Sequence, residues 1–165
     1  MKPIEFDVKL TDKDMYRFNM YHAYTGFQGI FATVIGIAVF VVAIMTAGKV
    51  ERTYTLLYLG FGIVFLIYMP VSLLMRSKRQ MLTSEVLKDT LHFKLDDAGV
   101  HVSQKGQTGD LPWNQIYKMV STKSNLLIYS SRINAYVVPK HFIEEQYGEI
   151  SKLASEKLES FQIKL

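Results

Sequence analysis

Two histidines flank a pair of acidic residues, and these side chains can bind metals or transfer protons. His92 and His101 lie on either side of Asp96 and Asp97, so a strand hairpin would bring two imidazoles close to two carboxylates. The spacing is loose, whereas metal sites have short, repeated ligand spacings. The sequence also contains no cysteine. We therefore expect no metal site and assign these residues to the surface of a hairpin.

Other candidate chemistry is also incomplete. Ser130, Ser131 and His141 combine a nucleophile with a base, but no Gly-x-Ser-x-Gly turn surrounds the serines. Gly106 and Gly109 lack the spacing of a phosphate-binding glycine loop. An enzyme would need a polar cavity holding an ionisable group with a strongly shifted pKa. We expect neither catalysis nor a bound cofactor.

Two long apolar runs organise the chain. Residues 26–47 and 54–75 each comprise 22 residues without a charged side chain. At 1.5 Å per residue, a helix of that length matches the ~30 Å hydrocarbon core of a bilayer. Buried helices of a soluble protein usually keep a polar face, and neither run has one. The sequence therefore predicts a two-helix transmembrane hairpin.

Small residues mark one face of the first run, where another helix could approach closely. They are Gly29, Ala32 and Gly36, followed by Ala43 and Ala47. The natural neighbour is the second run, but several copies of the hairpin could also pack through this face. In the second run, Pro70 predicts a kink, with Ser72 near enough to satisfy a freed carbonyl.

Basic residues indicate the orientation of this hairpin. Arg76, Lys78 and Arg79 follow the second run directly, and Lys13 and Arg17 precede the first, against Lys49 and Arg52 in the loop between the runs. Positive charge is retained on the cytoplasmic side of a membrane. We therefore expect both termini in the cytoplasm and the short loop outside.

The N-terminal segment has the period of a strand with one buried face. Ile4, Phe6 and Val8 alternate with polar residues, and an isolated strand cannot bury such a face. We therefore expect this strand to pair with strands that come after the hairpin. Thr11 and Asp14 then have the spacing of a capping box and predict a helix.

Beyond residue 90 the pattern changes to short alternating runs separated by turns. The expected strands are residues 91–95, 100–102, 111–113, 116–121, 126–130 and 135–138, and residues 143–159 form an amphipathic helix. The fold class is thus α+β: a transmembrane hairpin plus a small antiparallel barrel or sheet of the pleckstrin-homology-like kind, closed by a C-terminal helix. The N-terminal strand is a candidate seventh strand.

This organisation gives four segments. Residues 1–25 form the N-terminal strand and a juxtamembrane helix, 26–75 the hairpin, 76–89 a helical connector and 90–165 the cytoplasmic domain.

Three stretches of the last segment resemble the YcxB-like proteins of bacteria. They are Leu-Pro-Trp-Asn-Gln-Ile at 111–116, Asn-Leu-Leu-Ile-Tyr at 125–129 and Ala-Tyr-Val-Val-Pro-Lys at 135–140. Trp113, Ile116, Tyr129, Pro139 and Lys140 carry the motif. The resemblance implies a bacterial inner-membrane protein with a pleckstrin-homology-like C-terminal domain, and it leaves the biochemical role open.

The expected role is therefore binding, with an unidentified protein as partner. The alternatives are an oligomeric accessory subunit of a transporter or channel, and a module that binds anionic lipid through basic residues. The candidate lipid-facing residues are Arg76, Lys78, Arg79, Lys105 and Lys118. Acidic residues are interspersed among the basic ones, which favours a protein partner, and the lack of a dense basic and aromatic stripe argues against nucleic acid. Trp113 is expected to be a core anchor rather than a stacking platform.

Overall fold

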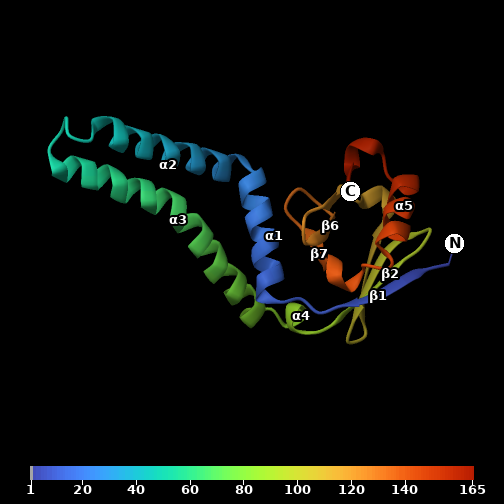
Figure 1. The fold of residues 1–165 in the computed structure, drawn as a ribbon. Helices are drawn as coiled ribbons and strands as arrows, with labels where there is room; N and C mark the ends of the chain where they lie inside the picture. Colours follow the sequence, from blue (N-terminus) through green and yellow to red (C-terminus); the bar gives the residue numbers. More distant parts are fainter. Residues whose placement is uncertain (1) are drawn as a thin grey trace. The chain divides into compact units, whose positions relative to one another are not determined.

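A computed structural model describes residues 2–165, which divide into two compact units (Figure 1). The helical unit is formed by Tyr16–Arg79. The sheet unit combines the residues up to Met15 with Gln80–Leu165. The N-terminal segment therefore folds together with the C-terminal segment, and the long helices are an insertion between them in the sequence.

Three helices follow the first strand. They are α1 (Asp12–Thr25), α2 (Phe27–Thr46) and α3 (Arg52–Thr83). The Thr11 hydroxyl donates to Asp14 Oδ2 at 2.6 Å and the Asp14 amide donates to Thr11 Oγ1 at 3.3 Å, so the predicted capping box starts α1. Both apolar runs are helical, and α3 continues well beyond residue 75 because no breaker interrupts it before Ser84.

The two apolar helices are almost entirely uncovered. The most apolar segments of α2 and α3 have mean hydropathies of 2.5 and 2.1, and only 17% and 6% of their residues are buried. The core helix of a soluble protein would instead be mostly buried. By length and composition, both helices could cross a membrane.

Two glycines set the contact between α2 and α3. A Cβ atom at Gly36 would lie 2.7 Å from Leu66 Cδ2, and one at Gly62 would lie 2.6 Å from Phe40 Cδ2. At Gly60 a Cβ atom would meet nothing within 4 Å. Gly36 and Gly62 therefore allow the two helices of one chain to approach closely.

The other predicted packing residues lie differently. Gly29 is buried against the backbone of Ala23, at the turn between α1 and α2, and Ala32 is half-buried. Only Gly36 of the three thus has a described contact with α3.

Pro70 lies inside α3, and Figure 1 shows that this helix bends along its length. Proline removes the amide that would bond to the carbonyl four residues earlier, which is that of Leu66. The Ser72 hydroxyl instead donates to the Met69 carbonyl at 2.9 Å. The expectation that Ser72 satisfies the freed carbonyl is wrong, because the serine reaches only its own preceding turn.

The first sheet contains the N-terminal strand. Its order is β1 (Ile4–Val8), β2 (Leu91–Leu95), β3 (Gly99–Gln104) and β4 (Gln107–Pro112), with antiparallel pairing throughout. Phe6 pairs with Phe93, and the β1 residues Ile4, Phe6 and Val8 are buried. The predicted pairing of the N-terminal strand with strands beyond the hairpin is confirmed.

The second sheet has the order β7 (Ala135–Pro139), β6 (Asn125–Tyr129), β5 (Lys118–Ser121) and β8 (Ile163–Lys164). The pairs β5–β6 and β6–β7 are antiparallel, whereas β8 runs parallel to β5. The terminal helix α5 (Tyr147–Lys157) buries Ile150, Leu153 and Ala154. The core of the sheet unit is thus built from both sheets and α5.

The expected barrel is not formed. Within residues 2–165 the strands make two separate four-stranded sheets. After β4, the 3-10 turn Trp113–Gln115 redirects the chain, and the outer edge of β5 is taken by β8, which the sequence pattern did not predict. With that edge occupied, β4 and β5 cannot pair to close a barrel.

Several expected boundaries also change. β4 begins at Gln107, four residues before the strand expected at 111–113, because Lys105 and Gly106 make a tight turn with φ of 47° and 80°. The terminal helix begins four residues later than expected, since Lys140–Phe142 forms a separate 3-10 turn. The helical connector expected at residues 76–89 is interrupted at Ser84, which caps the short helix α4 (Glu85–Lys88).

Candidate functional site

A groove of ≈ 230 Å³ lies in the sheet unit beside the edge strand β4. Its lining comes from α4, β2, β3, β4 and β7. The lining residues are Val86, Leu91, Val102, Gln104, Gln107, Thr108, Gly109 and Tyr136. We call this the β4 groove.

The β3–β4 turn and α4 position one wall of the β4 groove. The turn pairs Gln104 with Gln107, which places two uncharged amides together. Gln104 Nε2 donates to the Val86 carbonyl at 2.7 Å and thereby ties α4 to the end of β3. The wall is therefore fixed by side-chain hydrogen bonding as well as by strand register.

Tyr136 of β7 also lines the β4 groove. Its ring packs edge-on against Phe93 with centroids 5.9 Å apart. A Cβ atom at Gly109 would lie 3.5 Å from the Tyr136 hydroxyl, so the glycine leaves space under the tyrosine. A large side chain at position 109 would therefore reduce the space beside the Tyr136 hydroxyl.

The chemistry of the β4 groove is that of a binding surface. Its floor is apolar and its rim consists of glutamine and threonine side chains, with no charged side chain in the lining. The nearby Lys105 is paired with Asp89 at 2.6 Å, and this carboxylate raises the pKa of Lys105. Within residues 2–165, β4 pairs with β3 only, so its other edge is open.

The histidines flanking the acidic turn do not converge. His101 Nδ1 lies 2.5 Å from Asp110 Oδ1, and its Nε2 lies 3.2 Å from Asp96 Oδ1. His92 instead lies 2.7 Å from Asp7 of β1. Within residues 2–165, no group of three or more His, Asp or Glu side chains is arranged to hold a metal ion. The two imidazoles form separate cross-strand pairs with carboxylates.

The His101 cluster makes the stability of the sheet unit depend on pH. Asp110 and Asp96 raise the pKa of His101 above its ordinary 6.5, and the Ala98 amide followed by His101 lowers the pKa of Asp96 below 3.8. The His101 contribution is therefore complete below pH 6.5 and is lost as pH rises through the folded-state pKa. The Asp96 contribution is lost as pH falls below 3.8.

We accordingly expect His101→Gln to destabilise the full chain most between about pH 4 and 6.5, with a smaller difference at higher pH. Trp113 is the single tryptophan, and its indole donates to the Asp96 carbonyl at 2.9 Å, so its fluorescence can follow urea unfolding. His141→Gln is the control, because His141 is exposed and packs only on its neighbour Phe142 among its described contacts. A stability difference that does not vary with pH would contradict this account.

The serines and His141 lie at opposite ends of β6. Ser130 follows Tyr129 at one end, whereas Pro139, two residues before His141, pairs with Asn125 at the other. Ser131 Oγ accepts from the amides of Ile133 and Asn134 inside its own turn. The structure therefore does not bring this nucleophile and base together.

The motif residues are mostly buried. Trp113 and Ile116 are 7% and 1% exposed, and Tyr129 and Pro139 are also buried. Lys140 Nζ lies 5.0 Å from the centre of the Tyr147 ring. The burial of Trp113 matches a core anchor.

The candidate lipid-facing basic residues are dispersed. Lys118 pairs with Tyr129 at one end of β6, whereas Lys140 lies at the Asn125 end, and Lys105 is at a turn of the other sheet. Arg76, Lys78 and Arg79 are exposed on α3 in the helical unit. Lys105, Lys118 and Lys140 thus do not share one end of a sheet.

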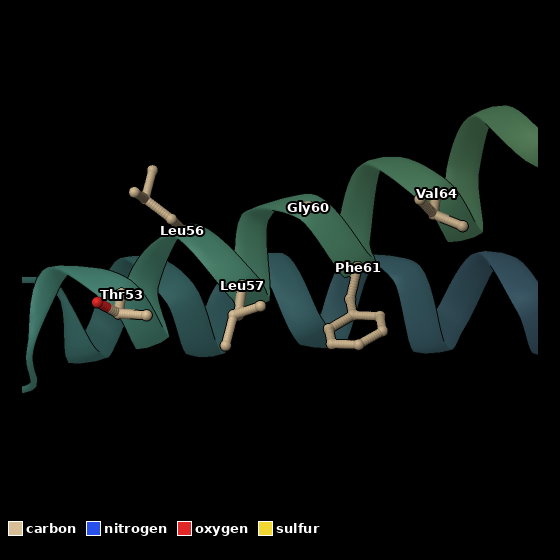
Figure 2. A pocket seen from close by; sticks show the side chains of 6 residues that line it. All are labelled: Thr53, Leu56, Leu57, Gly60, Phe61 and Val64. Carbon is tan, nitrogen blue, oxygen red and sulfur yellow. The ribbon is translucent and has the colours of Figure 1, made fainter.

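The helical unit has apolar hollows of its own. Figure 2 shows six residues spaced along α3, with Gly60 leaving a gap between the larger side chains. This hollow of ≈ 440 Å³ is lined by Thr53, Leu56, Leu57, Gly60, Phe61 and Val64. An adjoining hollow of ≈ 330 Å³ continues along the same helix to Met75. Their apolar lining suits hydrocarbon rather than a polar ligand.

Sequence reasoning missed Tyr136 and Gly109 as parts of a site. One available signal was the Lys105-Gly106 pair, which is compatible with a two-residue hairpin turn and hence with an edge strand starting at Gln107. No local signal places Tyr136 over that strand.

Comparison with protein families matches part of the sheet unit. Residues 95–154 match the family model described as YcxB-like protein. The matched region begins at the end of β2 and reaches into α5, and it includes all five motif residues. The searches of curated proteins and of solved structures found no match. The chain therefore carries a YcxB-like domain at residues 95–154, which confirms the family resemblance of its motifs.

Proposed function

We propose that the protein is a membrane-anchored module whose sheet unit binds an extended segment of a protein partner at the cytoplasmic face of the bacterial inner membrane. The low burial of α2 and α3 supports insertion of both helices. Arg76, Lys78 and Arg79 after the apolar part of α3 support cytoplasmic termini. The sheet unit would then be an open relative of the pleckstrin-homology-like fold.

The observation that carries the binding role is the open edge of β4 above an apolar groove. An edge strand offers unpaired backbone donors and acceptors, and a partner strand can add to it. The floor of the groove, formed by Leu91 and Val102, could receive alternate apolar side chains of such a strand. Backbone pairing would supply affinity and the groove would supply selectivity.

A protein segment fits the β4 groove better than a lipid headgroup does. Anionic headgroups are recognised by clustered basic side chains, whereas this lining has only uncharged polar groups. The closest lysine in sequence, Lys105, is already paired with Asp89. We therefore place the protein partner, rather than lipid, in the groove.

Filling the groove tests this proposal. Because a Cβ atom at Gly109 would already touch the Tyr136 hydroxyl, Gly109→Leu should occupy the space that a partner needs. A photoreactive amino acid at exposed Gln107 would report partners in native membranes. We expect Gly109→Leu to reduce cross-linking about tenfold or more, as an overpacking cost of ~1–3 kcal/mol implies.

The matched control is Gly148→Leu in α5, where a Cβ atom would meet nothing within 4 Å. It should leave the cross-links unchanged, and Trp113 fluorescence should show that both variants are folded. Equal cross-linking in the parent chain and Gly109→Leu would show that the β4 groove is not the binding site.

A further inference from the structure

Three exposed apolar side chains gather at one end of the second sheet. Tyr117, Ile133 and Phe161 are 46%, 68% and 81% exposed. We call these three residues the apolar tip. Each full burial of a side chain of this size is worth about 1.5–3 kcal/mol, so a surface that covers the tip would gain substantially.

Backbone hydrogen bonds bring the three segments together. The Tyr117 amide donates to the Tyr129 carbonyl at 2.8 Å, which places Tyr117 where β6 ends. Ile133 lies in the turn that follows β6, closed by Ser130 N donating to the Asn134 carbonyl at 3.1 Å. Tyr117, directly before β5, and Ile133, in the turn after β6, therefore lie at the same end of the second sheet.

Phe161 joins them through β8. This strand runs parallel to β5, with Ile163 opposite Met119, and Phe161 lies in the 3-10 turn Ser160–Gln162 directly before it. Gln162 Nε2 also donates to the Ile116 carbonyl at 2.7 Å, directly before Tyr117. These contacts hold the segments in place without using the side chains of Ile133 or Phe161, which remain exposed.

The charge around the apolar tip is positive. Residues 117–118, 130–134 and 160–162 contain Lys118 and Arg132 and no acidic residue. Lys118 Nζ lies 4.6 Å from the centre of the Tyr129 ring and 5.8 Å from that of Tyr117. Neither Lys118 nor Arg132 has an ion-pair partner within the described part of the chain. The neighbouring Glu159 caps the next turn and contributes one negative charge against these two positive charges.

Short connections join the sheet unit to the helical unit in the sequence. Only residues 9–11 separate β1 from α1, and residues 84–90 separate α3 from β2. Aromatic and aliphatic side chains flanked by lysine and arginine suit a lipid interface, where apolar groups enter the acyl boundary and cations meet phosphates.

We propose that the apolar tip docks on an anionic lipid leaflet, with Lys118 and Arg132 facing lipid phosphates. This inference rests on the proposed insertion of α2 and α3, and it concerns a surface separate from the β4 groove. Docking would restrict the sheet unit to one orientation on the membrane.

The absence of cysteine permits a direct test in the full chain. Ile133→Cys, Lys123→Cys and Ile63→Cys would each carry a small fluorophore in nanodiscs containing lipids spin-labelled near the headgroup or within the acyl chains. Lys123 lies in the turn at the other end of β5 and β6 and is the control, and Ile63 is an exposed residue of α3 that reports insertion.

We expect quenching at position 133 by headgroup-level spin labels in anionic nanodiscs, quenching at 63 by acyl-chain labels, and little at 123. Lys118→Glu combined with Arg132→Glu should reduce the quenching at 133 about tenfold, since an anionic surface would then repel the tip. Trp113 fluorescence should confirm that each variant is folded.

Two failures can be told apart. Quenching at 63 without quenching at 133 would overturn the docking of the apolar tip and leave the spans intact. A photoreactive group at 133 that then cross-links to a protein in native membranes would assign the tip to a protein partner instead. Absence of quenching at 63 would overturn membrane insertion, and the docking proposal with it.

Discussion

Replacing Phe6 by alanine is expected to lower the free energy of unfolding of the sheet unit by about 3–5 kcal/mol. Phe6 is 7% exposed and stacks on Phe93, with ring centroids 5.3 Å apart and an interplanar angle of 10°. Phe93 in turn packs edge-on against Tyr136, which lines the β4 groove. Removing the Phe6 ring would leave a cavity beneath the residues that form the groove.

Denaturant unfolding of the full chain in detergent, followed by Trp113 fluorescence, measures this loss, because the single tryptophan lies in the sheet unit. Glu5→Ala is the matched control, since Glu5 is exposed on the same strand. Surface substitutions of that kind change stability by ~0.5 kcal/mol or less. If Phe6→Ala and Glu5→Ala have equal effects, β1 is not an integral strand of the unit.

Much of the fold was predictable because it depends on local pattern. The alternation of Ile4, Phe6 and Val8 indicates a strand with one buried face, and the absence of any nearby partner requires a distant one. The two apolar runs specify helices for the same kind of reason. Their length and uniform apolar character predict helices, because a helix satisfies its backbone hydrogen bonds within one segment.

The open sheets were not predictable because they depend on contacts that local pattern does not encode. Residues 163–164 are too short to show a strand period, yet β8 occupies the edge of β5 that a closed barrel would need. Likewise, the sequence does not distinguish Gly60 from Gly62. Only the structure shows that Gly62 faces Phe40 on α2 and that Gly60 faces away.

The candidate site was the least predictable part. Val86, Gln104 and Tyr136 come from three separate elements, and none belongs to a motif with chemical meaning. The sequence directed attention instead to His92 and His101, which have the right chemistry for a site but separate carboxylate partners. Residue type thus indicated where charge lies, whereas the β4 groove depends on how the fold brings residues of separate elements together.

The central claim is that α2 and α3 cross the membrane and that the sheet unit lies in the cytoplasm. The basic residues Arg76, Lys78 and Arg79 follow the apolar part of α3, and only Lys49 and Arg52 lie between the helices. This distribution predicts an outside loop between α2 and α3. The expected effect on chemical access is all or none, because an intact bilayer excludes a charged thiol reagent.

Cysteine accessibility in intact cells tests this claim most directly, since the parent chain has no thiol. Thr53→Cys, at the exposed start of α3, should react with a membrane-impermeant reagent added outside. Ser103→Cys, on β3, should react only after the cells are permeabilised. Reaction at 103 with protection at 53 would contradict the cytoplasmic assignment, and equal reaction at both positions in intact cells would contradict a membrane barrier between them.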